Sequence, residues 1–154
     1  MALARILVDG YSLLHQWPAL APGKPRYSLA AREELIHQLT QYHDACGTPI
    51  TVIFDGASGQ VAELPGSPDV EVLYSRSGQT ADQMIERAAH RFGRYGEVMA
   101  VTDDHAERDT VISLGGSACS CLNFIQTVES TLTEMADDIK HHNRRERHKF
   151  QRRR

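Results

Sequence analysis

The clearest indication of the fold is the run Arg5-Ile6-Leu7-Val8-Asp9-Gly10. Its apolar residues follow one another without polar alternation, which is typical of a strand buried on both faces. An acidic residue and a glycine end the run. Strands of this kind belong to parallel sheets that helices cover on either side, so the stretch predicts an α/β fold.

Four more strands and four helices are predicted along the chain. The helices have apolar residues at helical spacing; Ser28 is the expected N-cap of the first, and Thr80 with Gln83 forms a capping box for the second. This order predicts a mainly parallel five-stranded sheet covered on both faces. The predicted strands are 50–54, 70–74, 98–102 and 117–121, the helices run from 29 to 46, 80 to 95, 104 to 114 and 122 to 142, and the main loops are 16–27 and 56–68.

Length and composition indicate a single globular domain. The chain has 154 residues and is 41% hydrophobic, without an apolar run long enough to cross a membrane. No signal peptide is evident at the N-terminus, so we expect a cytoplasmic protein without a membrane partner. The three cysteines are an odd number and predict no disulfide framework; Cys119 and Cys121 are expected on one face of the last strand.

Charge is distributed unevenly. Residues 1–139 hold 9 Lys and Arg against 19 Asp and Glu, whereas residues 140–154 hold 8 basic residues and one Glu. We therefore divide the chain into a domain, 1–139, and a basic tail, 140–154, which either extends the last helix or stays disordered until it binds. A dense basic tail attracts phosphates without reading sequence, so Arg144, Arg145 and Arg147 are candidate contacts to nucleic acid.

Acidic residues follow the predicted strands. Asp9, Asp55 and the pair Asp103 and Asp104 come directly after strands, and Asp82 opens a helix. Because the carboxyl ends of parallel strands lie along one edge, these carboxylates are expected to converge. Converging carboxylates repel each other unless a cation lies among them, and oxygen ligands suit Mg²⁺ or Mn²⁺.

We rank Asp9, Asp82 and Asp103 first as catalytic metal ligands. Asp104 is a further candidate ligand that better suits the N-cap of the helix after it, and Asp55 is equally well explained by a turn. Structural roles remain open for the others, since Asp9 could cap the following turn and Asp82 is favoured by the helix dipole. One or two divalent ions here would activate water and compensate charge during phosphodiester hydrolysis.

Other residues near the acids are candidate substrate contacts. Tyr11 follows the first acidic motif and could stack on a base or pack the crevice wall, and Ser12 could bond a phosphate or a water. Trp17 has the same two alternatives, stacking on RNA or packing in the core. Glu86 shares a helix face with Asp82 and could serve the site or pair with a basic neighbour.

The ordered motifs resemble the YacP-like NYN-domain family of PIN-like ribonucleases. The resemblance rests on Ile6–Tyr11, Val52–Gly56, Tyr74–Asp82 and Val101–Asp103, and it covers about residues 3 to 125. It implies a three-layer α/β/α fold and Mg²⁺- or Mn²⁺-dependent cleavage of single-stranded RNA. The family's acidic site falls on Asp9, Asp82 and Asp103 with Asp104 beside them. The family usually has Asn at the position of Ser12.

Two kinds of function follow. The first is a metal-dependent endoribonuclease, with the ribosome as a candidate partner because some members of the family act on messenger RNA there. The second, motivated by Ser12 and the basic tail, is a non-catalytic protein that binds RNA or the ribosome. A phosphatase is disfavoured because Tyr11 stands where a second aspartate is needed, and no glycine-rich phosphate loop occurs.

Overall fold

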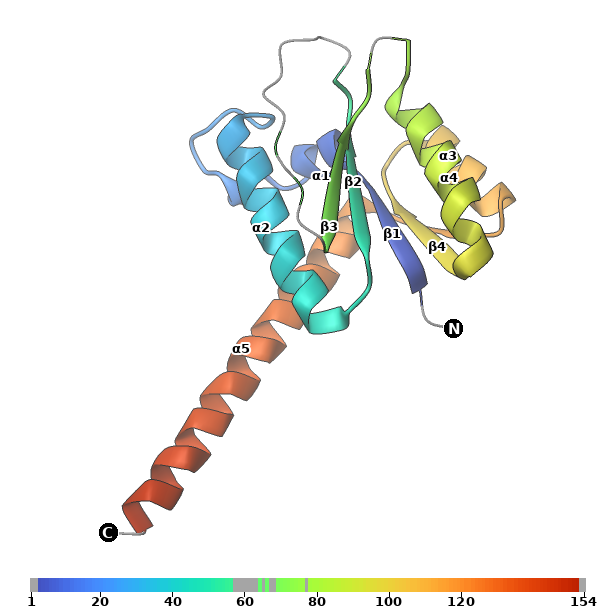
Figure 1. The fold of residues 1–154 in the computed structure, drawn as a ribbon. Helices are drawn as coiled ribbons and strands as arrows, with labels where there is room; N and C mark the ends of the chain where they lie inside the picture. The colour runs from blue at the N-terminus through green and yellow to red at the C-terminus, as the bar shows by residue number, and fades with distance from the viewer. Residues whose placement is uncertain (1–2, 57–63, 65, 67–68, 77, 153–154) are drawn as a thin grey trace.

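The computed structural model describes residues 3–56, 64, 66, 69–76 and 78–152. Its centre is a five-stranded parallel sheet in the order β3-β2-β1-β4-β5 (Figure 1). The strands are β1 (Leu3–Asp9), β2 (Ile50–Phe54), β3 (Val70–Tyr74), β4 (Glu97–Val101) and β5 (Ser117–Cys119). The helices are α1 (Gly10–His15), α2 (Leu29–Cys46), α3 (Ala81–Phe92), α4 (His105–Ser113) and α5 (Cys121–Arg152), with short turns η1 (Pro18–Leu20) and η2 (Gly93–Tyr95).

Helices cover both faces of the sheet, which confirms the predicted three-layer α/β/α fold. Alternate residues of β1 point to opposite faces. Ile6 and Val8 pack with α1, α2 and the first part of α5, including Leu35 and Phe124. Leu7 packs on the other face, where α3 and α4 supply the apolar side chains. Each face therefore has its own core, and the sheet between them is held rigidly.

The strand order explains why the first motif matters. From β1 the chain adds β2 and β3 on one side, then returns to add β4 and β5 on the other. The order therefore reverses between β1 and β4, and in open α/β sheets ligands bind in the crevice at this point. Asp9 ends β1, and Asp103 and Asp104 follow β4.

Gly10 lets the chain turn closely after β1. A Cβ atom added at Gly10 would lie 2.3 Å from Cε1 of Phe54, a ring that is fully buried. The backbone at this position has no positive φ, so close approach rather than a special conformation requires glycine. The approach brings α1 against the end of β2 and fixes the direction in which Asp9 leaves the strand.

The predicted N-caps of α2 and α3 are confirmed. The Ser28 hydroxyl accepts a hydrogen bond from the Ala31 amide, and Thr80 and Gln83 form the reciprocal capping box. α2 ends at Gly47, which has a φ of 74°. Because α3 begins at the edge where the strands end, its capped first turn presents Asp82 toward that edge.

Three predictions about local structure were wrong. The sequence predicted no helix at residues 10–15, where α1 follows its N-cap Asp9 and is too short to show an apolar period. β5 ends at Cys119, and Cys121 is the buried first residue of α5, so the two cysteines do not share a strand face. Residues 93–95 form the separate turn η2 rather than the end of α3.

Two open alternatives are also resolved. Trp17 is only 6% exposed and packs in the core, so it is an anchor and not a stacking surface. The tail extends the last helix: α5 runs without interruption through residue 139 to Arg152 and projects from the body (Figure 1). Most of the loop predicted at 56–68 lies outside the described residues. Within the described part of the chain, no helix is both long and apolar enough to cross a membrane.

Candidate active site

A cleft of about 560 Å³ opens at the edge of the sheet where the strands end. It lies at the point where the strand order reverses. Three strand ends and the first turns of α3 and α4 supply its acidic residues. The lining comprises Asp9, Tyr11, Ser12, His15, Gln16, Tyr27, Asp55, Thr80, Ala81, Asp82, Asp103, Asp104 and Glu107.

Asp9 has a structural role and a position in the cleft at once. Its carboxylate caps α1 by accepting a hydrogen bond from the Ser12 amide at 3.4 Å. The second oxygen lies 3.3 Å from the Thr102 hydroxyl, which donates to it. Burial raises the pKa of Asp9, while the hydrogen bonds that it accepts oppose the rise. The carboxylate is thus fixed in orientation by two neighbouring elements.

Three other carboxyl groups lie close together beside it. One oxygen each of Asp82, Asp104 and Glu107 lies within 4.8 Å of the others. Asp82 and Asp104 are exposed, and Glu107 is 3% exposed. They come from α3, the β4–α4 junction and the first turn of α4, so the fold and not local sequence brings them together.

Glu107 is the residue that the sequence did not reveal. Burial raises its pKa to about 10, and a hydrogen bond with Asp9 and the charges of Asp9 and Asp82 act in the same direction. Glu107 therefore carries a proton at neutral pH and donates it to the Asp9 carboxylate. Glu107 lies three residues after the N-cap Asp104, the spacing of an ordinary capping box. The sequence pattern alone therefore does not indicate a role in the cleft.

Thr102 ties these groups together. It is fully buried, and its hydroxyl lies 3.3 Å from Asp9 and 3.2 Å from Glu107. The same hydroxyl accepts a hydrogen bond from the Asp104 amide at 3.1 Å. A threonine at the end of a strand reads as a β-former, so nothing in the sequence marks Thr102 as the residue that orients the acidic group.

The two aspartates after β4 make different hydrogen bonds, and the one predicted as the cap, Asp104, also belongs to the acidic group. Asp104 caps α4, as predicted, through one oxygen that accepts from the amides of Ala106 and Glu107, and it also joins the acidic group. Asp103 accepts a hydrogen bond from the Cys121 amide at 3.0 Å and so holds the start of α5. Asp103 lines the cleft, and its role as a metal ligand stays a prediction.

Ser12 links the first and the fourth strand ends. Its hydroxyl accepts a hydrogen bond from the Asp103 amide at 3.1 Å, and the Cys121 thiol lies 3.6 Å away as a donor. Desolvation raises the pKa of that thiol to about 12, so it stays protonated. Ser12 therefore holds the cleft together, and its contact with substrate stays a prediction.

Aromatic side chains form one wall of the cleft. The Tyr11 ring meets Tyr27 edge-on at 5.0 Å and lies 5.2 Å from Phe54. Tyr11 thus packs against the wall and still borders the cleft, which leaves both of its predicted roles open. Asp55 also borders the cleft, and it accepts a hydrogen bond from the Ser75 hydroxyl at 3.0 Å, in keeping with the turn role.

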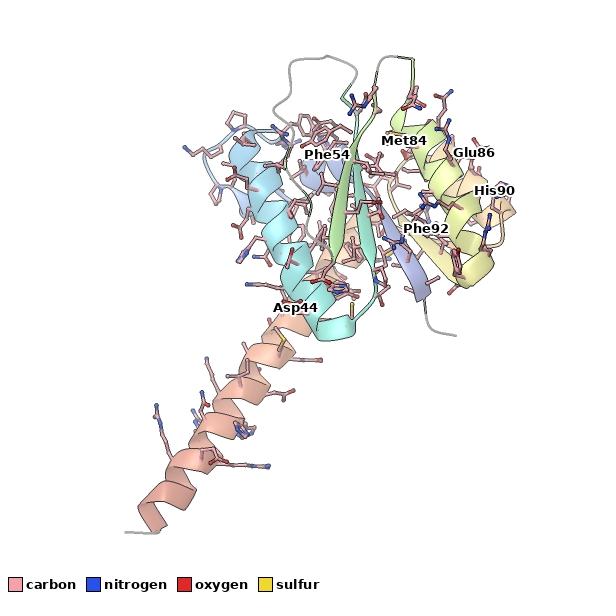
Figure 2. The ribbon with its side chains drawn as sticks, in the orientation of Figure 1. Asp44, Phe54, Met84, Glu86, His90 and Phe92 are labelled. Atoms are coloured by element: carbon pink, nitrogen blue, oxygen red, sulfur yellow. The ribbon has the colours of Figure 1, made fainter. Side chains whose placement is uncertain are left out.

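Some predicted residues lie away from the cleft. Glu86 projects from α3 on the side away from the sheet and borders a different hollow (Figure 2). Arg144, Arg145 and Arg147 are exposed on the projecting half of α5. Arg144 is 23 residues beyond the start of that helix, about 35 Å along its axis. Their contact with nucleic acid stays a prediction.

The donor set fits a hard divalent cation. Asp9, Asp82, Asp104 and Glu107 offer only carboxylate oxygens, and none of the four forms an ion pair with a Lys or Arg of the described residues. A second group, His43, Asp44 and Asp69, lies near the end of α2, but a contact of 3.4 Å between His43 Nε2 and Asp69 Oδ1 accounts for it. The cleft is therefore the better candidate for a metal site.

Comparison with known proteins agrees with this architecture. Residues 6–154 match the family model described as the YacP-like NYN domain. The uncharacterized protein YacP of Bacillus subtilis is 29% identical over 129 residues, which cover 80% of this chain and 76% of that protein. The crystal structure of Rae1 (YacP) from Bacillus subtilis superposes with a TM-score of 0.75 at 25% identity, over 91% of this chain and 80% of that one. A mutant of the same protein gives the same TM-score.

Proposed function

The chain belongs to the YacP-like NYN domain family, and from this we propose that it is a metal-dependent endoribonuclease that cleaves single-stranded RNA. One observation supports the metal site above all others. Oxygens of Asp82, Asp104 and Glu107 lie within 4.8 Å of one another, next to Asp9 and without a basic partner among the described residues. Such a group is suited to hold a divalent cation, and PIN-like nuclease folds usually use divalent ions for hydrolysis.

The residues of the cleft would hold Mg²⁺ or Mn²⁺. Asp9, Asp82, Asp104 and Glu107 are the proposed ligands, with Asp103 as a further one. When bound, the ion supplies an activated water and compensates charge on the phosphate. The Thr102 hydroxyl contacts both Asp9 and Glu107 and fixes the orientation of the two carboxyl groups. Glu107 must first lose the proton that it donates to Asp9, which makes metal binding stronger as the pH rises.

The aromatic wall supports a single strand as the substrate. Bases of single-stranded RNA are free to stack on aromatic side chains, whereas bases in a duplex are not. Tyr11 and Tyr27 stand beside the acidic group at the entrance of the cleft. A ribosome partner, and an RNA contact by the basic end of α5, remain proposals that rest on the family resemblance and on charge.

Cleavage by the purified protein tests this function. A 5′-labelled single-stranded RNA incubated with the full chain and Mn²⁺ should yield shorter products, because the ion completes the acidic site. EDTA should slow cleavage by at least about 100-fold, and excess Mn²⁺ should restore it. Gel analysis of the products gives the rates, and a DNA strand of the same sequence serves as the comparison.

Two results separate the competing functions. Products that appear only with metal support the nuclease. Tight RNA binding without turnover at any Mg²⁺ or Mn²⁺ concentration would instead favour the non-catalytic RNA-binding protein.

A further inference from the structure

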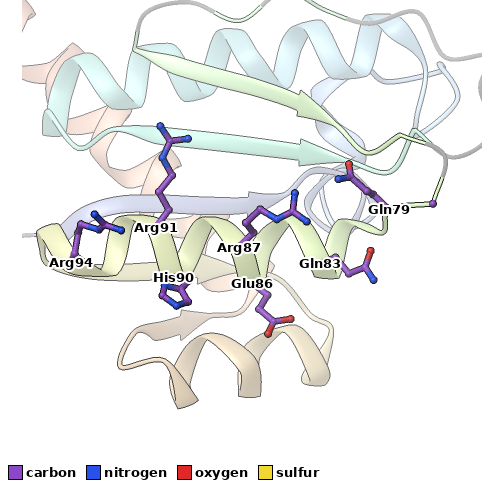
Figure 3. A pocket seen from close by; sticks show the side chains of 8 residues that line it. Gln79, Gln83, Glu86, Arg87, His90, Arg91 and Arg94 are labelled. Atoms are coloured by element: carbon purple, nitrogen blue, oxygen red, sulfur yellow. The ribbon is translucent and has the colours of Figure 1, made fainter.

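A second, larger hollow runs along the exposed side of α3. It has a volume of about 780 Å³ and is lined by residues from Gly78 to Arg94. Figure 3 shows that Arg87, Arg91 and Arg94 extend from one side of the helix, whereas Glu86 and His90 extend from the other. The spacing of four and three residues keeps the arginines in one row.

The row of arginines stands out against the charge of the molecule. Residues 1–139 contain 19 acidic and only 9 basic residues, yet three of the nine lie in this row. All three are exposed, and none forms an ion pair with a described acidic residue. The helix dipole favours Arg91 in the last turn of α3, and its guanidinium lies 5.4 Å from the centre of the Phe92 ring. Neither contact neutralises the charge of the row, which therefore suits an anionic partner.

The hollow meets the acidic cleft at the start of α3. Gly78, Gln79 and Gln83 line the hollow, and Thr80, Ala81 and Asp82 line the cleft. At 1.5 Å per residue, Arg87 is about 7.5 Å and Arg91 about 13.5 Å along the axis from Asp82. An extended polyanion that leaves the cleft in this direction would meet one guanidinium group after another.

A smaller apolar hollow beside the row points to nucleotides rather than to a simple polyanion. It measures about 210 Å³, lies between α3 and the edge strand β3, and is lined in part by Leu73, Met84 and Phe92. Arg87 and Arg91 border both hollows. Cationic groups beside an apolar recess are suited to bind a phosphate and its base together.

We propose that the row Arg87, Arg91 and Arg94 binds the phosphates of single-stranded RNA on one side of the cleavage site, with a base in the recess at Met84 and Phe92. This inference rests on the proposed function, because it gives the path of the same substrate. The row is independent of the basic end of α5, which lies on another element. It accounts for how an acidic protein holds RNA close to its own carboxylates.

Binding of a fluorescent 12-nucleotide single-stranded RNA to the full chain tests the row. The measurements use an Asp9→Asn background, which keeps the RNA intact, and fluorescence anisotropy at several salt concentrations. Arg87→Gln with Arg91→Gln should weaken binding about tenfold and reduce the salt slope by about 1.4, since a single strand contributes about 0.7 per neutralised phosphate. Circular dichroism checks that the variants fold, as their exposed positions predict.

Lys24→Gln is the matched control, because Lys24 is also exposed but lies in the loop before α2. It should change affinity less than twofold, against about threefold for Arg91→Gln alone. Equal losses for Lys24 and Arg91, or binding of the double variant as tight as that of the parent, would overturn the row. Inorganic polyphosphate of equal charge that binds as tightly as the RNA would show that no base occupies the recess at Met84 and Phe92.

The proposed function can fail separately. If the wild-type chain does not cut RNA with any divalent ion but the arginine variants still lose affinity, the proposed nuclease function is wrong and RNA binding by the arginine row is supported. If the wild type cuts RNA while the double variant binds and cuts as well as the wild type, RNA binding by the arginine row is wrong and the proposed nuclease function is supported.

Discussion

Replacement of Asp9 by asparagine should reduce Mn²⁺-dependent cleavage of single-stranded RNA by on the order of 100- to 1000-fold, the scale on which one preorganised charge acts. The substitution removes the charge and retains the shape. Asparagine can still accept the hydrogen bond from the Ser12 amide that caps α1, and the Thr102 hydroxyl can still lie against it. The loss should therefore appear in the rate constant of cleavage and not in the folded fraction.

Asp109→Asn is the matched control for this variant. Asp109 is an exposed aspartate of α4 that does not line the cleft, so the same chemical change should leave the rate within about twofold. Rates come from single-turnover assays with a labelled strand. If Asp9→Asn cuts as fast as the parent chain, Asp9 does not belong to the catalytic site.

Glu107→Gln should produce an opposite pair of effects, lower activity and higher stability. The amide cannot bind a divalent ion as a carboxylate does, so cleavage should fall by on the order of 100-fold. In the metal-free protein, however, glutamine imitates the protonated side chain and can donate a hydrogen bond to Asp9. No residue that only supports the fold should behave in this way.

The sign of the stability change follows from the pKa. Glu107 has an ordinary pKa of 4.5 and one of about 10 in the folded chain. The folded state therefore binds more protons than the unfolded state between these two values. The contribution of Glu107 to the free energy of unfolding is fully present below about pH 4.5 and is lost as the pH rises toward 10. Glu107→Gln should remove this part of the pH dependence and stabilise the metal-free protein at pH 8 by on the order of 1–3 kcal/mol.

Thermal unfolding in EDTA at pH 5, 6.5 and 8 measures this effect. Each kcal/mol should appear as about 2–4 °C in Tm for a chain of this size. Glu86→Gln makes the same chemical change at an exposed position outside the cleft and should leave the Tm nearly unchanged. Parallel pH profiles for the parent and Glu107→Gln would show that Glu107 is not protonated in the folded state.

The sequence predicted the parts of the structure that depend on local pattern. Continuous apolar runs located the strands. Because parallel strands end at a common edge, the sequence also predicted that the carboxylates of this edge converge, namely Asp9, Asp55, Asp82, Asp103 and Asp104. The capping box of Thr80 and Gln83 fixed the start of α3. These features need no knowledge of contacts between distant residues.

Roles that depend on tertiary contacts could not be foreseen. Glu107 resembles any acidic residue in a first helical turn until its burial and its contact with Asp9 are known. Thr102 likewise acquires its role from two residues far apart in the chain. The arginine row of α3 was missed because Arg87 reads as an ordinary solvated charge unless the neighbouring hollows are seen.

The most direct test of the metal site is a crystal soaked in Mn²⁺ and measured at a wavelength where manganese scatters anomalously. We expect an anomalous peak enclosed by Asp82, Asp104 and Glu107, at bonding distance from their oxygens and beside Asp9. The peak should be absent from a Glu107→Gln crystal treated in the same way. Absence of a peak in the parent crystal, at Mn²⁺ concentrations that support cleavage in solution, would show that this acidic group does not hold the ion.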